Sequence, residues 1–265
     1  KRVNKQFQKI LKKWSDFLNS PKSRYVLNKG PNGWFGKRAS KKFNIDEYIH
    51  DKSKKYYGFK SWNDFFVRKF VPGARPIAEP YNNKAIVAPC DFTIYKIQKS
   101  VKKYDSFWVK EQPYSLMDML DNDTKYVDMF VGGSIFQAFL NPFNYHRWSS
   151  PIAGTIIKAH VIPGLYFSEH SPIQGFEHRK VWKWIDEGID PNDQDASEGY
   201  ITTNQTRAAI YIKSPDPKIG IMVFMAFGMV EISSCIINNY IKPGYKIKKG
   251  EELGRFQFGG SSACL

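Results

Sequence analysis

The stretch IKPGYKIKKGEELGRFQF, residues 241–258, is typical of short β-strands joined by tight turns. Pro243-Gly244 suits a type II turn, because glycine readily adopts the positive φ that this turn requires. The last part of the stretch, 252–258, is one predicted strand. The same pattern of short β-branched or aromatic-rich stretches between turn residues extends back to about residue 84. Further strands are predicted at 85–88, 92–97, 130–140, 155–161, 208–212, 219–227 and 231–237.

An earlier stretch, residues 150–164, is a distant repeat of residues 241–254 and has its own turn at Pro163-Gly164. Because both turns join short strands, we predict a positive φ at Gly164 as well as at Gly244. Residues 241–254 also resemble a hairpin of the biotinyl/lipoyl sandwich. This resemblance concerns the fold alone and implies no carrier lysine.

The helical signal lies mainly in the first third of the chain. Residues 3–18 place apolar side chains three and four positions apart with lysines between them, which predicts an amphipathic helix. Such a helix lies either on a membrane surface or against the domain core, and packing on the core is favoured. Shorter helices are predicted at 44–50, capped by Asn44 or Asp46, and at 62–70, capped by Ser61.

Helices followed by strands predict an α+β fold, with N-terminal helices and a mainly antiparallel β catalytic domain that contains the sandwich-like portion. We place the N-terminal helical region at residues 1–75 and the β-rich domain at residues 76–265. The chain begins without Met and stops at Leu265. We therefore expect a fragment of a longer precursor, truncated at its C-terminus.

The composition narrows the class of protein. Among 265 residues, 40 Lys and Arg outweigh 25 Asp and Glu to give a formal net charge of +15, and 16% are aromatic. This aromatic content excludes a disordered polyelectrolyte, and the lack of an apolar run of about 18–20 residues excludes a transmembrane segment. We expect a cytoplasmic or peripheral membrane protein. The charge suits an anionic lipid surface, but no nucleic-acid-binding motif accompanies it, so no nucleic-acid partner is expected.

The spacing of histidine and cysteine argues against a metal site. The five histidines lack the His-x-x-x-His pattern, and Cys90, Cys235 and Cys264 suit neither a disulfide framework nor a zinc site. The acidic segment 186–199 lacks the spacing of a calcium-binding loop and is predicted to be a surface loop. No metal cofactor is expected. The chain also lacks a glycine-rich phosphate loop and the Gly-x-Ser-x-Gly pattern of α/β-hydrolases.

The unusual chemistry lies in Gly259-Gly260-Ser261-Ser262. Two glycines leave the backbone before Ser261 unhindered, so the Ser261 hydroxyl can attack the Gly260 carbonyl and replace the amide by an ester. Elimination and hydrolysis would then leave a pyruvoyl ketone at the new amino terminus, an electron sink made from the chain itself. Taken alone, this short sequence is more typical of a flexible loop.

Further motifs accompany it, and together they resemble the phosphatidylserine decarboxylase family of pyruvoyl enzymes in the family's order and over most of the chain. The motifs are Trp62-Asn63-Asp64-Phe65-Phe66-Val67-Arg68, Gly73-Ala74-Arg75-Pro76-Ile77, Ala88-Pro89-Cys90-Asp91, Tyr145-His146-Arg147-Trp148, and Gly250-Glu251-Glu252-Leu253-Gly254-Arg255-Phe256. Resemblance to the soluble branch that contains L-tryptophan decarboxylases rests on Tyr56-Tyr57-Gly58-Phe59, Gly133-Ser134-Ile135, Phe139-Leu140-Asn141 and Gly228-Met229-Val230-Glu231-Ile232-Ser233 with Cys235.

The resemblance implies self-cleavage between Gly260 and Ser261 into α and β chains, with Ser261 becoming the pyruvoyl group and with neither pyridoxal phosphate nor a metal. The amine of an amino acid would form a Schiff base with the ketone and lose CO₂, as in the conversion of L-tryptophan to tryptamine. His146 is the candidate acid and base near neutral pH. Asp91 matches the aspartate that orients a histidine during self-cleavage. Candidate substrate-binding residues are Tyr145, Trp148 and Phe258.

One position departs from the family pattern. The family usually has a second histidine three residues after the first, in the triad that activates the serine, and here Ser149 stands there. A serine cannot act as a general base near pH 7. Either His146 substitutes, or cleavage is slow, or the chain is a relative that does not mature.

The function therefore has three candidates. The first is decarboxylation of an aromatic amino acid. The second is conversion of phosphatidylserine to phosphatidylethanolamine at an anionic membrane, and the third is binding of a ligand or partner without catalysis. A homodimer is compatible with each of them.

Overall fold

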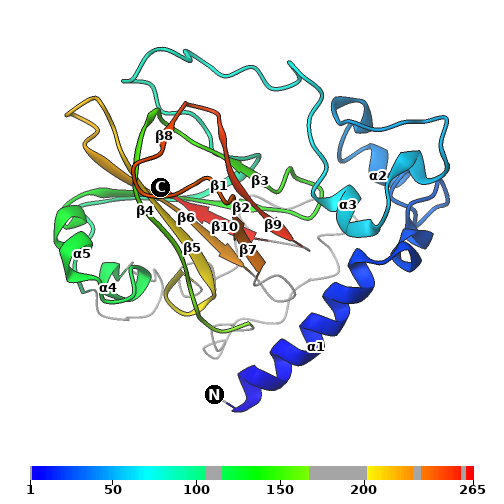
Figure 1. Ribbon diagram of the computed structural model, residues 1–265, viewed down its shortest axis with the longest axis horizontal. Coiled ribbons are helices and arrows are strands. Elements are labelled where there is room, and N and C mark those ends of the chain that lie inside the picture. Colours follow the sequence, from blue (N-terminus) through cyan, green and yellow to red (C-terminus); the bar gives the residue numbers. More distant parts are fainter. Residues whose placement is uncertain (1, 105–114, 167–201, 229–233, 258–260) are drawn as a thin grey trace, which may run out of the picture.

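The computed structural model describes residues 2–104, 115–166, 202–228, 234–257 and 261–265. Its first part is helical, as predicted, and Figure 1 shows these helices to one side of the strands. The longest helix, α1, is followed by short α-helices and by three 3₁₀ helices labelled η. Their bounds are α1 (Arg2–Asn19), η1 (Pro21–Val26), α2 (Lys37–Ser40), η2 (Ile45–Glu47), η3 (Lys55–Gly58) and α3 (Trp62–Phe66).

The described strands that follow form two antiparallel sheets. The larger has seven strands in the order β1-β2-β10-β6-β5-β4-β8, and the smaller has three in the order β3-β9-β7. The bounds are β1 (Thr93–Lys99), β2 (Ser134–Leu140), β3 (Arg147–Ser149), β4 (Gly154–Ile162), β5 (Arg207–Lys213), β6 (Ile221–Gly228), β7 (Ser234–Ile237), β8 (Lys246–Ile247), β9 (Glu252–Gln257) and β10 (Ser261–Cys264). The predicted α+β class is confirmed.

The seven-stranded sheet has an apolar cluster on each of its two faces. One cluster joins it to the small sheet and contains Trp148, Phe224 and Phe256, none of which is exposed. The other joins it to α4 (Leu116–Met119) and α5 (Thr124–Phe130), seen beside the strands in Figure 1. Because side chains alternate between the faces of a strand, neighbouring residues of β5, β6 and β10 contribute to different clusters.

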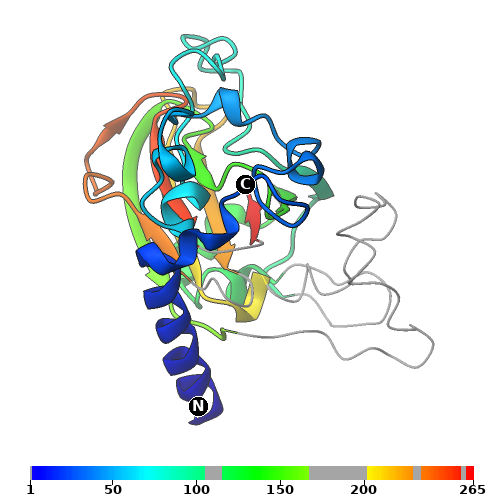
Figure 2. The same cartoon turned by 90° about the vertical axis from the view of Figure 1, so that its right-hand side faces the viewer.

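The predicted amphipathic helix is present as α1, but the expected packing on the core holds only at its end. Leu18 is 7% exposed, whereas Val3 is 69%, Ile10 63% and Trp14 44% exposed. Figure 2 shows α1 projecting from the body of the molecule. Asn4 ties the start of the helix to the segment after β4, since it donates to the Gly164 carbonyl.

The caps were predicted better than the lengths of the helices. Asn44 accepts a hydrogen bond from the Asp46 amide, but only η2 follows, where residues 44–50 were predicted to be helical. Ser61 accepts a hydrogen bond from the Asp64 amide, and α3 then ends at Phe66 instead of residue 70.

Two of the strand predictions were wrong in the described part of the chain. Residues 85–88 form no strand, and the predicted strand 130–140 begins only at Ser134, because Thr124–Phe130 is helix α5. The first residues of the predicted strand 231–237 and the acidic segment 186–199 lie outside the described residues.

The two Pro-Gly turns differ from each other. Gly244 has the predicted positive φ of 90°, whereas Gly164 does not lie in that region. Gly164 is needed for a different reason, since a Cβ there would lie 2.4 Å from the Gln205 carbonyl carbon. The repeated stretches do meet, because Gly154 and Thr155 pair with Ile247 and Lys246. The likeness to a biotinyl/lipoyl sandwich stays a prediction.

Within the described ranges, none of the helices combines the length and apolar character that a membrane crossing needs.

Candidate active site

The predicted cleavage position adjoins the start of β10, in the interior of the larger sheet. Ser261 pairs with Leu140 of β2 on one side and with Gly228 of β6 on the other. Gly260 and Phe258, which were singled out from the sequence, lie outside the described residues. Because a strand paired on both sides is held by two ladders of backbone hydrogen bonds, the backbone at residue 261 is closely fixed.

A buried polar contact fixes the next residue. The side chains of Ser262 and Gln137 are both fully buried, and Gln137 Nε2 donates to Ser262 Oγ over 3.0 Å. Ser262 Oγ donates in turn to the Ala138 carbonyl over 3.1 Å. A buried hydroxyl needs such partners, since an unsatisfied one costs free energy. No local pattern indicates Gln137, because its partner lies 125 residues away in the chain.

His146 lies between the end of β2 and the start of β3. Its carbonyl accepts a hydrogen bond from the Phe256 amide, so the loop that carries it is joined to β9. Its side chain is fully buried, with the Phe66 ring centroid 4.3 Å from its own. Nδ1 lies 2.9 Å from the Asn144 carbonyl oxygen, which can only accept, so Nδ1 carries a proton. In a neutral ring this tautomer makes Nε2 the basic nitrogen.

Tyr145 and Trp148, two of the predicted substrate-binding residues, have different environments. Tyr145 is half-buried, and its ring centroid lies 4.0 Å from that of Phe70. Burial raises the pKa of Tyr145 to about 12. Trp148 is fully buried and meets Phe256 edge-on at 4.9 Å. Trp148 therefore packs in the core between the sheets, without an exposed surface for a substrate, and its substrate-binding role stays a prediction.

Asp91 lies near cationic side chains. The carboxylate is half-buried and forms an ion pair with Arg75, with 3.7 Å between the Arg75 Nε and Oδ1 of Asp91. Burial raises the pKa of Asp91, and Arg75 opposes this. Ser149 is half-buried in β3, and its amide donates to the Pro89 carbonyl over 2.7 Å, two residues before Asp91. The predicted role of Asp91 in orienting a histidine stays a prediction.

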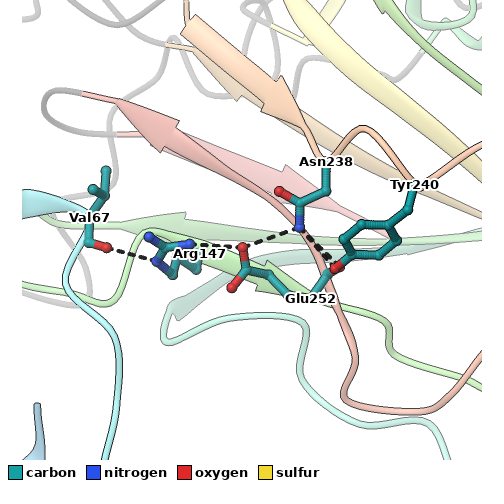
Figure 3. A network of polar contacts seen from close by, with 5 residues as sticks. All are labelled: Val67, Arg147, Asn238, Tyr240 and Glu252. Carbon is teal, nitrogen blue, oxygen red and sulfur yellow. Dashed lines mark hydrogen bonds and ion pairs between the residues drawn. The ribbon is translucent and has the colours of Figure 1, made fainter. Parts of the chain in front are cut away.

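A polar network beside His146 was missed by the sequence analysis (Figure 3). Arg147 donates to the Val67 carbonyl over 2.7 Å and to Glu252 Oε1 over 2.8 Å. Asn238 donates to the same carboxylate oxygen, and the Tyr240 hydroxyl donates to the Glu252 carbonyl. The network joins the end of α3 to β3 and β9. Arg147 and Glu252 stand inside quoted motifs, but their contact spans 105 residues and no local spacing predicts it.

In the described part of the chain, no group of three or more His, Cys, Asp and Glu side chains gathers that could hold a metal ion. The described cysteines are free and buried. Burial raises the pKa of the thiols of Cys90 and Cys235, which makes each a poor nucleophile.

Comparison with known proteins identifies the family of the chain. The family model of phosphatidylserine decarboxylase matches residues 62–265, which include both sheets, and a second phosphatidylserine decarboxylase model matches residues 1–43. The chain belongs to the phosphatidylserine decarboxylase family. The resemblance read from the motifs is therefore confirmed, and the match reaches the helical region as well.

Three relatives indicate the range of this family. "Decarboxylase iboD" of Amanita muscaria is 36% identical over 99% of the chain, which covers 76% of that protein. The L-tryptophan decarboxylase of Psilocybe cubensis is 34% identical over the whole chain, which spans only 62% of that enzyme. The phosphatidylserine decarboxylase proenzyme of Saccharophagus degradans is 29% identical over 84% of the chain and 73% of the relative.

Proposed function

We propose that this family member is a pyruvoyl-dependent decarboxylase of a free aromatic amino acid such as L-tryptophan, formed by self-cleavage between Gly260 and Ser261. The observation that carries the proposal is the position of β10, whose first residue is paired on both sides. One of its partner strands, β2, leads within six residues from Leu140 to the buried His146. A reactive group at residue 261 needs a fixed backbone and a nearby acid or base.

The pyruvoyl group would supply the ketone that captures the substrate amine and accepts the electron pair released with CO₂. The chain's own residues would do the rest. Pairing by β2 and β6 and the contact between Gln137 and Ser262 would hold the backbone still. The burial of His146 among Phe66 and Phe256 would keep water away from the ring. Its basic Nε2 would take or return the proton that the reaction requires.

The choice of an aromatic amino acid rests on the relatives. Two Psilocybe proteins that carry the name L-tryptophan decarboxylase are 34% and 33% identical over nearly the whole chain. Three relatives named as phosphatidylserine decarboxylase proenzymes are more distant, at 28–31% identity over 77–84% of the chain. Release of labelled CO₂ from L-tryptophan and from phosphatidylserine tests the choice. Release from phosphatidylserine alone would overturn it.

Self-cleavage is tested by denaturing mass spectrometry. The expected result is two chains divided before residue 261, with a carbonyl on the second that borohydride reduces. Ser261→Ala should abolish division, and Ser40→Ala, an exposed serine in α2, should leave it unchanged. Only intact chain after prolonged incubation of the unaltered protein would overturn the proposal and favour the non-maturing relative.

The serine at position 149 allows a sharper version of this test. If the missing histidine limits maturation, Ser149→His should speed chain division, because imidazole can accept a proton near pH 7 and a hydroxyl cannot. An unchanged rate would mean that His146 or another group already supplies the base. Ser150→His is not a suitable control, since Ser150 is fully buried, so Ser40→His serves instead.

A second candidate, decarboxylation of phosphatidylserine at a membrane surface, is favoured by one observation. The exposed apolar residues Val3, Ile10 and Trp14 fall on one side of α1, with lysines between them. Such a helix binds anionic lipid surfaces. Sedimentation with phosphatidylserine vesicles should then be weakened by Ile10→Glu and not by Tyr81→Glu, which alters an aromatic side chain outside α1 that is 95% exposed. Equal binding of the two variants would remove this candidate.

A further inference from the structure

A polar groove of about 720 Å³ separates the region around α3 from the outer side of the small sheet. Lys60, Asp64 and Lys69 line it from the helical side. Arg147, Glu252 and Arg255 line it from β3 and β9, and part of this wall is visible in Figure 3. The groove thus brings four cationic side chains together with two carboxylates.

Both carboxylates already have partners within the protein. Glu252 accepts from Arg147 over 2.8 Å and from Asn238 over 3.2 Å. Asp64 accepts from the Lys60 backbone amide over 2.8 Å at the start of α3. These contacts use one cation, Arg147, and leave the others without an acidic partner.

Three cations therefore remain available to a ligand. Among the described residues, the side chains of Arg255, Lys60 and Lys69 form no hydrogen bond or ion pair. Arg255 is half-buried, whereas the two lysines are exposed. Burial and the nearby charge of Arg147 both lower the pKa of Arg255, so its charged form is held at a cost. A bound anion would offset that cost.

This groove lies on the face of the small sheet opposite the His146 ring. Arg147 pairs with Arg255 across β3 and β9, and residues paired in this way share a face of the sheet. The neighbouring positions Trp148 and Phe256 belong to the core on the opposite face, and the His146 ring lies 6.4 Å from that of Phe256. A ligand of the groove would thus be separate from the substrate.

We propose that the groove binds a small anion that bears a carboxylate or phosphate group, with Arg255 as its principal contact. A guanidinium matches both groups because it can donate two parallel hydrogen bonds to them. Lys60 and Lys69 contribute charge from the opposite wall, and the side-chain amide of Gln257 adds a further donor. The bound anion joins the helical region to β9.

Binding is tested by calorimetry with inorganic phosphate and with succinate as probes, at constant ionic strength. Saturable binding of at least one probe is expected, and Arg255→Gln should weaken it at least tenfold. Lys218→Gln removes an exposed charge between β5 and β6 and should leave affinity unchanged. Because Arg255 has no partner to lose, Arg255→Gln should fold normally, which the melting temperature verifies. The double variant Lys60→Gln/Lys69→Gln provides a second reading from the other wall.

Two results would overturn the proposal: no saturable binding of either probe, or equal weakening by Arg255→Gln and Lys218→Gln. The phosphate could belong to a soluble metabolite or to a lipid headgroup. Vesicles containing phosphatidic acid distinguish these sources, since vesicle binding that depends on Arg255 assigns the site to a headgroup. Binding of free phosphate alone assigns it to a soluble anion. No readout uses decarboxylation, so the outcome is independent of the proposed function.

Discussion

The two faces of the small sheet differ in kind although they are built from the same strands. On the inner face, Trp148 and Phe256 are fully buried among apolar side chains, and His146 lies beside them. On the outer face, Arg147 and Arg255 stand opposite each other in a polar groove. One residue step along a strand therefore separates the packed core from a charged surface. The contrast shows that adjacent residues of a motif such as Tyr145-His146-Arg147-Trp148 can have different roles.

The largest expected effect tests the inner face. Trp148→Ala should lower the free energy of unfolding by about 3–5 kcal/mol, because it leaves a cavity in the core. Arg255→Gln on the outer face should change it by no more than about 0.5 kcal/mol. Urea unfolding followed by fluorescence measures both. Similar losses from the two variants would mean that the faces are not energetically distinct.

The next effect tests the contact that crosses the outer face. Arg147→Met removes the cation beside Glu252, whose side chain is 28% exposed, and should cost about 1–3 kcal/mol of unfolding free energy. Glu252→Gln keeps the shape and removes the charge. A double-mutant cycle between the two is expected to show coupling of about 0.5–3 kcal/mol. Additive losses would mean that the pair contributes nothing beyond its separate parts.

A comparable test applies to the polar pair next to the predicted cleavage position. Ser262→Ala removes the hydroxyl that Gln137 contacts and should cost about 1–2 kcal/mol in unfolding free energy. Chain division should also become slower, because the backbone at residue 261 is held less firmly. Time courses of division, with Ser40→Ala as the control, measure this. Division at the unaltered rate would show that the sheet alone holds the backbone.

The smallest effect concerns the half-buried carboxylate of Asp91. Burial raises the pKa of Asp91 above its ordinary value of 3.8, so folding takes up protons. Stability from this group is complete below that value and is lost as the pH rises through the folded pKa. Asp91→Asn should therefore make the protein more stable than the unaltered protein at pH 7, and this gain should disappear at pH 3. Melting temperatures at the two pH values check the sign.

Local signals in the sequence predicted local structure well. Periodicity located α1, and the side chains of Ser61 and Asn44 identified the starts of α3 and η2. The strand predicted at 130–140 begins too early, because Phe130 and Val131 are apolar and a short apolar stretch suits a buried helix as well as a strand. Phe130 instead ends α5, which covers the face of the sheet opposite the small sheet.

The candidate site was predictable only in part. Motif order indicated the family and singled out Ser261, His146 and Asp91, but contacts between distant residues were beyond its reach. β10 is only four residues long and finds its partners in β2 and β6, far back in the chain. Likewise, no residue near Gln137 in the sequence predicts its contact with Ser262. The ion pair between Asp91 and Arg75 also follows only from the fold.

The double pairing of β10 also bears on what a cut chain would be. A break before residue 261 that forms a pyruvoyl group would remove one covalent link and the Ser261 amide nitrogen, but it would leave Ser262–Cys264 paired with β2 and β6. The product that begins at residue 261 would remain held in the larger sheet, with Ala263 and Cys264 buried on opposite faces of that sheet. Native purification would then yield a single particle, and the two pieces would come apart only when the sheet itself is denatured.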